Sequence, residues 1–234
     1  MYNGEVMITT DTVIDNNIDV ILPFERHKEV FIESLGEVPK KPFYAFVKRA
    51  IDIVVSLFAM VIMFIPVAIS GIIIKCTSKG SIFYSQERLG LNGEKFNLIK
   101  LRTMREDAEK NGVMWSQGDS DPRITKFGLF LRKTHIDEVP QFLLILSGKM
   151  SLVGPRPERE VFYNEFEQYI HGFHERLKVK PGLTGLAQVN GAYNLRPEEK
   201  IVFDVEYIKT RSIINEIKIM LKTVGVVLRG DGAK

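Results

Sequence analysis

The chain has 234 residues, and 32 Lys and Arg residues nearly balance 29 Asp and Glu residues, which gives a formal net charge of +3. This length fits one sizeable domain or two small ones. The balanced charge excludes a strongly basic nucleic-acid-binding protein, although a local basic face is compatible with it, and we expect no nucleic-acid partner. The single cysteine, Cys76, excludes an internal disulfide and fits a reducing compartment.

Residues 1–41 lack a clear apolar period, and we expect them to form a flexible, acidic arm. The first residues are polar and acidic, so we predict no secretory signal peptide. An uncharged stretch follows: from Ile53 to Ile74 the chain runs for 22 residues without a charge. That length meets the criterion for a membrane helix and is long for a buried core helix. We therefore assign residues 42–79 to a membrane segment.

Pro66 interrupts the uncharged stretch and predicts a kink. The two arms on either side of it are only about 20 and 14 Å long, and neither alone crosses a hydrocarbon core of about 30 Å. Lys and Arg residues stand on both sides of the stretch, so the positive-inside rule gives no preferred direction. A re-entrant helix with both ends on the cytoplasmic side explains these features. A spanning helix is the alternative, because prolines are also tolerated in ordinary spans.

Residues 80–230 are predicted to form a domain of mixed secondary structure. Two strand-like runs, 82–87 and 95–102, flank Asn92-Gly93, which is a strong hairpin signal. A short polar helix is expected over residues 104–112, closed by Gly112. The fold class is therefore α+β, with a small β-hairpin.

Helices are expected to dominate the rest of this domain. One helix ends near Gly148, and two more meet near Ser212. In the last helix, apolar residues recur at i, i+3 and i+4 spacing: Ile213, Ile217, Met220, Leu221, Val224 and Leu228. Both packing against the core and lying in the membrane interface as an amphipathic helix explain this stripe.

The stretch THIDEVPQFLLIL, residues 134–146, contains two adjacent acids, Asp137 and Glu138. Proline is tolerated only in the first helical turn, so Pro140 places both acids at or just before a helix N-terminus. Asp is a preferred N-cap, the helix dipole stabilises acidic residues there, and Thr134 is spaced to form a capping box. A structural cap is therefore one interpretation of this pair.

The other interpretation is chemical, because a helix N-terminus also binds phosphate. Cations recur along the chain at Lys100, Arg102, Arg123, Arg132, Lys133 and Arg156. Arg156 lies between Pro155 and Pro157, which stiffen its backbone. Mg²⁺ is typically held by one or two carboxylates and substrate phosphates, and arginine contacts phosphate oxygens bidentately. This composition indicates a magnesium-dependent phosphoryl-transfer site.

Four motifs occur in order, "KLRTM", "DPRITKFGLFLRKTHIDEVPQ", "MSLVGPRPE" and "VKPGLTGLAQVNG". They resemble successive motifs of the bacterial sugar transferases, the monotopic phosphoglycosyl transferases, from about Phe43 to Leu228. The resemblance implies transfer of a sugar-1-phosphate from a UDP-sugar to undecaprenyl phosphate, with release of UMP. It also implies a membrane-bound enzyme whose catalytic domain faces the cytoplasm at the bacterial inner membrane, in contact with phospholipids. Such a reaction would initiate exopolysaccharide, capsule, O-antigen or glycoprotein glycan synthesis.

The resemblance also implies roles for individual residues. Asp137 would be the nucleophile that attacks the β-phosphorus in a covalent two-step route. Asp137 and Glu138 together would bind Mg²⁺. Phosphate-binding positions would be Lys100, Arg102, Arg132 and Arg156. The family carries a re-entrant helix bent at a proline, which favours that interpretation of Pro66; members usually have Ser before this proline, where this chain has Ile65.

Two other functions are compatible with parts of the sequence. A metal-dependent nucleotide-sugar glycosyltransferase would use Asp119 and Asp121 of "GDSDPR", although a stretch of this composition is typical of a turn. A non-catalytic membrane scaffold for polysaccharide assembly would keep its function after Asp137→Asn. The transferred sugar, the glycan pathway and a homo-oligomeric state are left open by the sequence.

Overall fold

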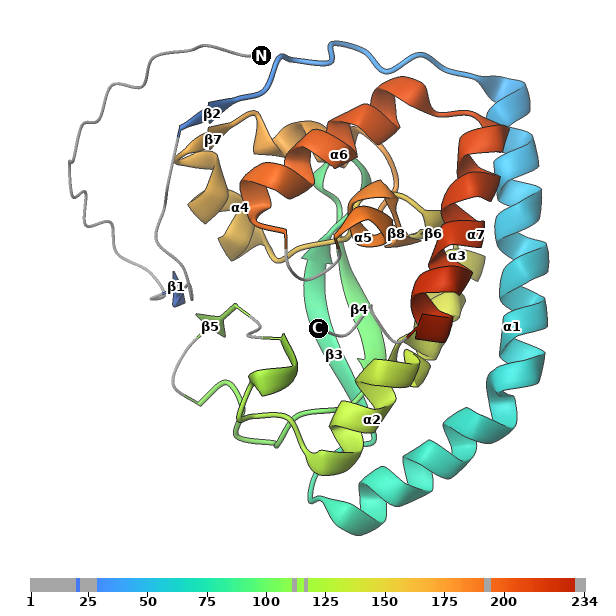
Figure 1. The fold of residues 1–234 in the computed structure, drawn as a ribbon, viewed down its shortest axis with the longest axis vertical. Helices are drawn as coiled ribbons and strands as arrows, with labels where there is room; N and C mark the ends of the chain where they lie inside the picture. The colour runs from blue at the N-terminus through green and yellow to red at the C-terminus, as the bar shows by residue number, and fades with distance from the viewer. Residues whose placement is uncertain (1–19, 22–28, 111–112, 116–117, 192–194, 230–234) are drawn as a thin grey trace.

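The computed structural model describes residues 20–21, 29–110, 113–115, 118–191 and 195–229. Helices predominate in these residues, and the strands pair into small two-stranded sheets. In Figure 1, helix α1 (Pro42–Thr77) runs along one side of the molecule, with helix α7 (Ile213–Arg229) beside its N-terminal part. The predicted class, α+β and mainly helical, is confirmed for this part of the chain.

Helix α1 contains the whole uncharged stretch. It begins at Pro42, since a proline at the first helical position loses no intrahelical hydrogen bond. Pro66 lies inside the helix, and Figure 1 shows α1 bending in its C-terminal part. Among the described helices, α1 is long and apolar enough to cross a membrane by length and composition. Only 17% of its most apolar window is buried, so most of its apolar surface faces outward.

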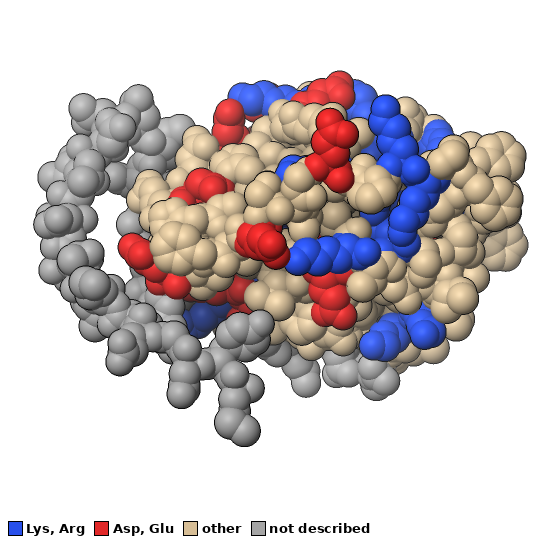
Figure 2. All heavy atoms as spheres, turned by 90° about the horizontal axis from the view of Figure 1, so that it is seen from above, with Lys and Arg blue, Asp and Glu red and all other residues tan. Residues whose placement is uncertain are grey.

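Large apolar side chains cover this outward face. Phe43, Phe58, Val61 and Phe64 are each between 68% and 78% exposed. Figure 2 looks onto the end of the molecule where α1 begins, and Lys and Arg side chains form an arc beside an uncharged edge. An apolar surface bordered by cations is typical of a protein surface that meets lipid and its headgroups.

Strands β3 (Phe83–Leu89) and β4 (Lys95–Leu101) form the predicted antiparallel hairpin, with Phe83 opposite Leu101. The turn η1 (Leu91–Gly93) holds Asn92 at φ 56° and Gly93 at φ 79°, the left-handed region that Asn and Gly tolerate best. The hairpin prediction is therefore confirmed.

The polar helix predicted over residues 104–112 is wrong for the described part of that stretch. Residues 106–110 form turns, in which the Ala108 and Lys110 N–H groups donate to carbonyls three residues earlier. A short segment with hardly any apolar side chain has no face to bury, and isolated short helices are unstable in water. Gly112, the predicted end of that helix, lies outside the described residues.

The helical stretch that contains the acidic pair is divided into three elements: α2 (Lys126–Thr134), η3 (Ile136–Gln141) and α3 (Phe142–Leu146). The division occurs at His135, whose left-handed conformation (φ 55°) ends α2. The chain therefore enters a separate 3₁₀-helix at the acidic pair.

The remaining elements between η1 and α7 are short: β5 (Val113–Met114), η2 (Gly118–Ser120), β6 (Ser151–Val153), α4 (Glu160–Glu167), β7 (Ile170–His171), η4 (Phe173–Lys178), β8 (Gly182–Thr184), α5 (Leu186–Asn190) and α6 (Pro197–Thr210). Parallel pairs join β6 to β8, β1 (Val20–Ile21) to β5, and β2 (Val30–Phe31) to β7. Within the predicted arm, Leu35 and Val38 also pack against buried side chains of the main body.

Helices α6 and α7 meet at Ser212, as predicted. Glu216 and Ile219 of α7 face the core and are 2% and 4% exposed. Most of the predicted stripe faces away from the core, since Ile217, Leu221, Val224 and Leu228 are all exposed. The exposure of the stripe favours an interfacial position over core packing.

Candidate active site

A cleft of about 1090 Å³ opens between α1, the β3–β4 hairpin, η3 and α7. Part of its apolar wall comes from α1 and α7: Val55, Ala59, Met63, Pro66, Val224 and Val227. Its charged wall contains every site residue predicted from the sequence: Lys100, Arg102, Arg132, Asp137, Glu138 and Arg156. The cleft thus brings together side chains from separate sequence motifs and sets them beside the long apolar helix α1.

The acidic pair occupies the first turn of η3, and Pro140 lies inside the same element. The predicted capping box is wrong, because the Thr134 hydroxyl donates to the carbonyls of Phe130 and Leu131 at the end of α2. The residue before η3 is His135, which makes no side-chain cap. Asp137 is therefore not an N-cap, and its carboxylate is directed elsewhere.

Asp137 is only 4% exposed. Burial, with the adjacent Glu138 carboxylate, raises the pKa of Asp137 from 3.8 to about 7, although Lys100, Arg132 and Arg156 oppose the shift. The two carboxylates therefore repel one another, and a cation placed between them would restore the ionised form of Asp137.

Lys100 reaches the site from β4, where it lies opposite Tyr84. Its ammonium stands 5.6 Å from the centre of the Tyr84 ring. Burial lowers the pKa of Lys100 to about 8, against the attraction of the Asp137 carboxylate and with help from Arg132. This buried ammonium and the buried carboxylate stabilise one another's charge.

Glu138 pairs with Arg156, whose Nη2 lies 2.5 Å from the Glu138 Oε1. Burial alone would raise the pKa of Glu138, but the Arg156 guanidinium outweighs burial and holds the pKa below its usual value. The Arg156 side chain is still 32% exposed, so it retains access to the cleft. The arginine between the two prolines therefore contacts the acidic pair directly.

The other two predicted arginines differ in their surroundings. Arg132, in the last turn of α2, donates from Nε to the Thr103 hydroxyl at 3.0 Å and acts electrostatically on Asp137. Arg102 instead donates to the Lys79 carbonyl and to the Ser78 hydroxyl, the latter at 2.8 Å. The described bonds of Arg102 thus hold the end of α1, and its predicted contact with phosphate stays a prediction.

The rival Asp119-x-Asp121 site receives no support from the described residues. Asp121 is 3% exposed, and both of its oxygens accept from Arg123, at 2.8 and 2.6 Å. The side chain of Asp119 lies outside the described part of the structure. Asp121 therefore serves as a structural partner of Arg123 here.

The sequence patterns did not point to several further charged residues on the cleft wall, among them Arg88, Glu158 and Lys200. Arg88 donates to Glu158 at 3.0 Å, and the two residues are far apart in the sequence. Glu158 directly follows the Pro-Arg-Pro motif, and this position next to a candidate phosphate-binding arginine could have identified it as a site residue. Lys200 lies over the Trp115 ring at 5.0 Å and carried no local signal.

The residues present fit magnesium. No group of three or more His, Cys, Asp and Glu side chains gathers among the described residues. Two adjacent carboxylates remain, and their mutual repulsion is the condition that a bound cation relieves. Mg²⁺ commonly takes one or two carboxylates and completes its shell with phosphate and water, so Asp137 and Glu138 are the residues that would hold it.

Comparison with known proteins identifies relatives of this chain. A UDP-N-acetylgalactosamine-undecaprenyl-phosphate N-acetylgalactosaminephosphotransferase of Aeromonas hydrophila is 36% identical over 204 residues, covering 86% of this chain and 48% of the relative. The UDP-glucose:undecaprenyl-phosphate glucose-1-phosphate transferase of Escherichia coli is 36% identical over 206 residues, covering 82% and 44%. The exopolysaccharide production protein ExoY of Sinorhizobium fredii is 32% identical over 207 residues, covering 82% and 90%.

The chain thus spans about half the length of the first two of these relatives. The family model described as bacterial sugar transferase matches residues 43–230, which is most of the chain. This chain therefore belongs to the bacterial sugar transferase family.

Proposed function

We propose that this chain transfers a sugar-1-phosphate from a UDP-sugar to undecaprenyl phosphate and releases UMP, at the cytoplasmic face of the bacterial inner membrane. The observation that carries the proposal is the buried carboxylate of Asp137 among three cations, in a cleft that apolar side chains of α1 and α7 also line. An anionic donor requires the charged wall, and a polyprenyl acceptor requires the apolar wall. The reactions for which the Aeromonas and Escherichia relatives are named support the same reaction class.

The reaction would proceed in two displacements at one phosphorus atom. A carboxylate oxygen of Asp137 forms a bond to the β-phosphorus, and the bond from that phosphorus to the bridging oxygen breaks, so UMP leaves with the electron pair. An oxygen of the acceptor phosphate then attacks the same phosphorus and displaces Asp137. One phosphoanhydride is replaced by another, so the overall reaction is nearly balanced in free energy.

The residues around Asp137 would stabilise the charge that accumulates during each step. Lys100, Arg132 and Arg156 supply the positive charge that lets an anionic nucleophile approach a diphosphate. Mg²⁺, held by Asp137 and Glu138, would neutralise further charge on the phosphate oxygens. The apolar wall would limit the access of water and protect the acyl phosphate from hydrolysis.

The decisive experiment supplies a UDP-sugar labelled in the sugar, with Mg²⁺ and without acceptor. We expect label to remain on the protein and to be released when undecaprenyl phosphate is added. Asp137→Asn should abolish this labelling, whereas Asp121→Asn, the matched acid of the rival site, should keep it if the protein stays folded. Labelling of the Asp137→Asn protein would refute the assignment of the nucleophile, and full function of that variant in cells would favour the scaffold.

We further propose that α1 is re-entrant, with both ends on the cytoplasmic side. The bend within α1 and the position of the cleft beside it support this topology. In a Cys76→Ser background, a cysteine placed at Lys79 should react with a membrane-impermeant reagent only after the cytoplasmic side is opened. Reaction from the periplasmic side of intact cells would instead establish a spanning helix.

A further inference from the structure

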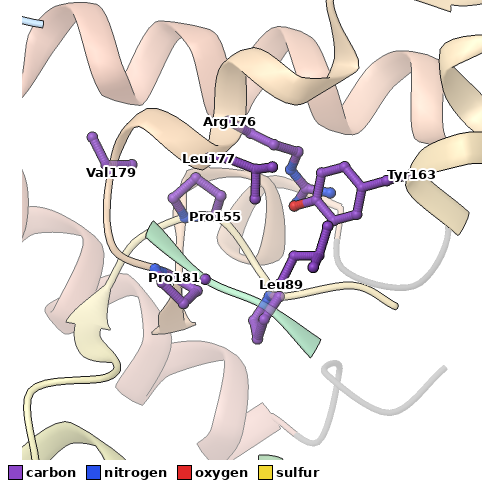
Figure 3. A pocket seen from close by; sticks show the side chains of 9 residues that line it. Leu89, Pro155, Tyr163, Arg176, Leu177, Val179 and Pro181 are labelled. Atoms are coloured by element: carbon purple, nitrogen blue, oxygen red, sulfur yellow. The ribbon is translucent and has the colours of Figure 1, made fainter. Parts of the chain in front are cut away.

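The position of Arg156 depends on more than the two prolines beside it. The prolines restrict the backbone, but neither has an N–H group that could anchor the turn. The Arg156 carbonyl oxygen accepts a hydrogen bond from Nη2 of Arg176, at 2.9 Å. Figure 3 shows the Arg176 side chain running past Leu177 to the ring of Tyr163. A second arginine, from η4, therefore holds the backbone of the arginine that contacts the acidic pair.

Arg176 is itself held from α6. Its Nη2 lies 2.7 Å from Oδ2 of Asp204, and both side chains are only 2% exposed. The guanidinium also lies 4.9 Å from the centre of the Phe173 ring and 5.7 Å from that of Tyr163. One nitrogen thus makes both the ion pair and the contact with the Arg156 carbonyl.

A buried ion pair is weak evidence for a role in stability, because replacing both members with apolar residues is often neutral or stabilising. The buried Arg176–Asp204 pair is therefore better explained by a role other than stability. That role is geometric. The Arg176 guanidinium fixes the carbonyl of Arg156, and the Arg156 side chain lies 2.5 Å from Glu138.

We propose that Arg176, held by Asp204, is a positioning residue that sets Arg156 at the angle needed to contact the phosphates of the donor. This inference rests on the proposed function, in which Arg156 binds donor phosphate. Catalytic geometry is sensitive to small displacements, and a misplacement of about 1 Å by a remote change can cost about 100-fold in rate.

The test variant is the double replacement Arg176→Met with Asp204→Leu, which removes both buried charges at once. We expect its unfolding temperature to stay near that of the wild type, while kcat/KM for UMP release falls about 100-fold. Lys178→Gln is the matched control. It breaks an ion pair with Glu175 on the same helix η4, makes no described contact with Arg156, and should keep wild-type kcat/KM.

A double-mutant cycle with Arg156→Ala separates positioning from general damage to the fold. If Arg176 acts through Arg156, the double replacement should cost nothing further once Arg156 is gone. A full additional loss in that background would overturn the inference, as would wild-type kcat/KM in a folded double-replacement protein. Wild-type kcat/KM in Arg156→Ala itself would instead refute the proposed role of Arg156, and the inference would fall with it.

If the double replacement does not fold, Arg176→Lys provides the second measurement. Lysine keeps the buried positive charge beside Asp204, but its nitrogen ends one bond short of the position of Nη2. We expect kcat/KM for this variant to lie between those of the wild type and Arg156→Ala. Wild-type kcat/KM in the folded lysine variant would overturn the inference.

Discussion

Replacing Asp137 with asparagine should change the pH dependence of stability in a direction that the structure fixes. Asp137 is buried beside Glu138, and its pKa in the fold is about 7 against an ordinary value of 3.8. The folded protein therefore binds this proton more tightly than the unfolded chain does. The contribution to stability is complete below about pH 4 and is lost as the pH rises towards 7. An asparagine side chain does not titrate, so the variant would not show this loss.

The size of the effect follows from the same shift. One pKa unit corresponds to about 1.4 kcal/mol, so between pH 5 and pH 7 Asp137 can lower the free energy of unfolding by about 3 kcal/mol at most. Lys100 changes the stability difference between variant and wild type in the same direction. The Asp137 carboxylate raises the pKa of Lys100, so this pKa falls further in the Asp137→Asn protein. The buried Lys100 cation then lowers the stability of the variant at low pH. For a chain of this size, each kcal/mol corresponds to about 2 to 4 °C in unfolding temperature.

The assay is thermal unfolding in detergent with EDTA present, at pH values from about 5 to about 8, since bound metal would itself favour the ionised form. As the pH rises across this range, we expect the unfolding temperature of the Asp137→Asn protein to increase by about 5 to 10 °C relative to that of the wild type. Asp107→Asn is the control, because the Asp107 side chain is 62% exposed, and its difference from the wild type should stay constant. An Asp137→Asn difference that is equally constant, or that shrinks as the pH rises, would refute the burial argument.

Three further predictions concern the contacts around the cleft. Asp52→Ala should lower the free energy of unfolding by about 1 to 3 kcal/mol in denaturant titrations, because it strips buried acceptors from the Ser151 hydroxyl and the Leu152 N–H; an unchanged midpoint would contradict this. Arg102→Gln should lower the unfolding temperature by freeing the Ser78 end of α1, and a raised KM for the UDP-sugar in the folded variant would support the phosphate-binding prediction. EDTA should abolish UMP release and Mg²⁺ should restore it, and activity that persists in EDTA would argue against the metal.

Much of the architecture could be predicted because its signals are local. The uncharged stretch predicts α1, and Asn92-Gly93 predicts the β3–β4 hairpin, since turn chemistry and length act within a few residues. The acidic pair, the Pro-Arg-Pro arginine and the basic residues of "KLRTM" could likewise be selected as candidates, and the cleft contains them all.

The errors arose where longer-range packing decides local structure. The sequence predicts one helix that begins at the acidic pair and ends near Gly148, whereas the structure has the 3₁₀-helix η3 followed by α3, and His135 separates them from α2 by a left-handed conformation that no helix propensity indicates. The polar segment after Met104 was predicted helical from composition alone, although a helix in a protein is stabilised mainly by packing of its apolar face. The support of Arg156 by Arg176 and Asp204 joins three distant motifs, so no local pattern could reveal it.

The long apolar helix α1 also supports the candidate active site. Asp52 of α1 accepts hydrogen bonds from the first two residues of β6, and Lys48 donates to the carbonyl of Val153 at its end, at 2.9 Å. Strand β6 leads directly into the Pro-Arg-Pro turn, so a shift of α1 would be transmitted to Arg156 within three residues. α1 also forms much of the apolar wall of the cleft. Displacing α1 would therefore disturb the apolar wall of the cleft and Arg156 together.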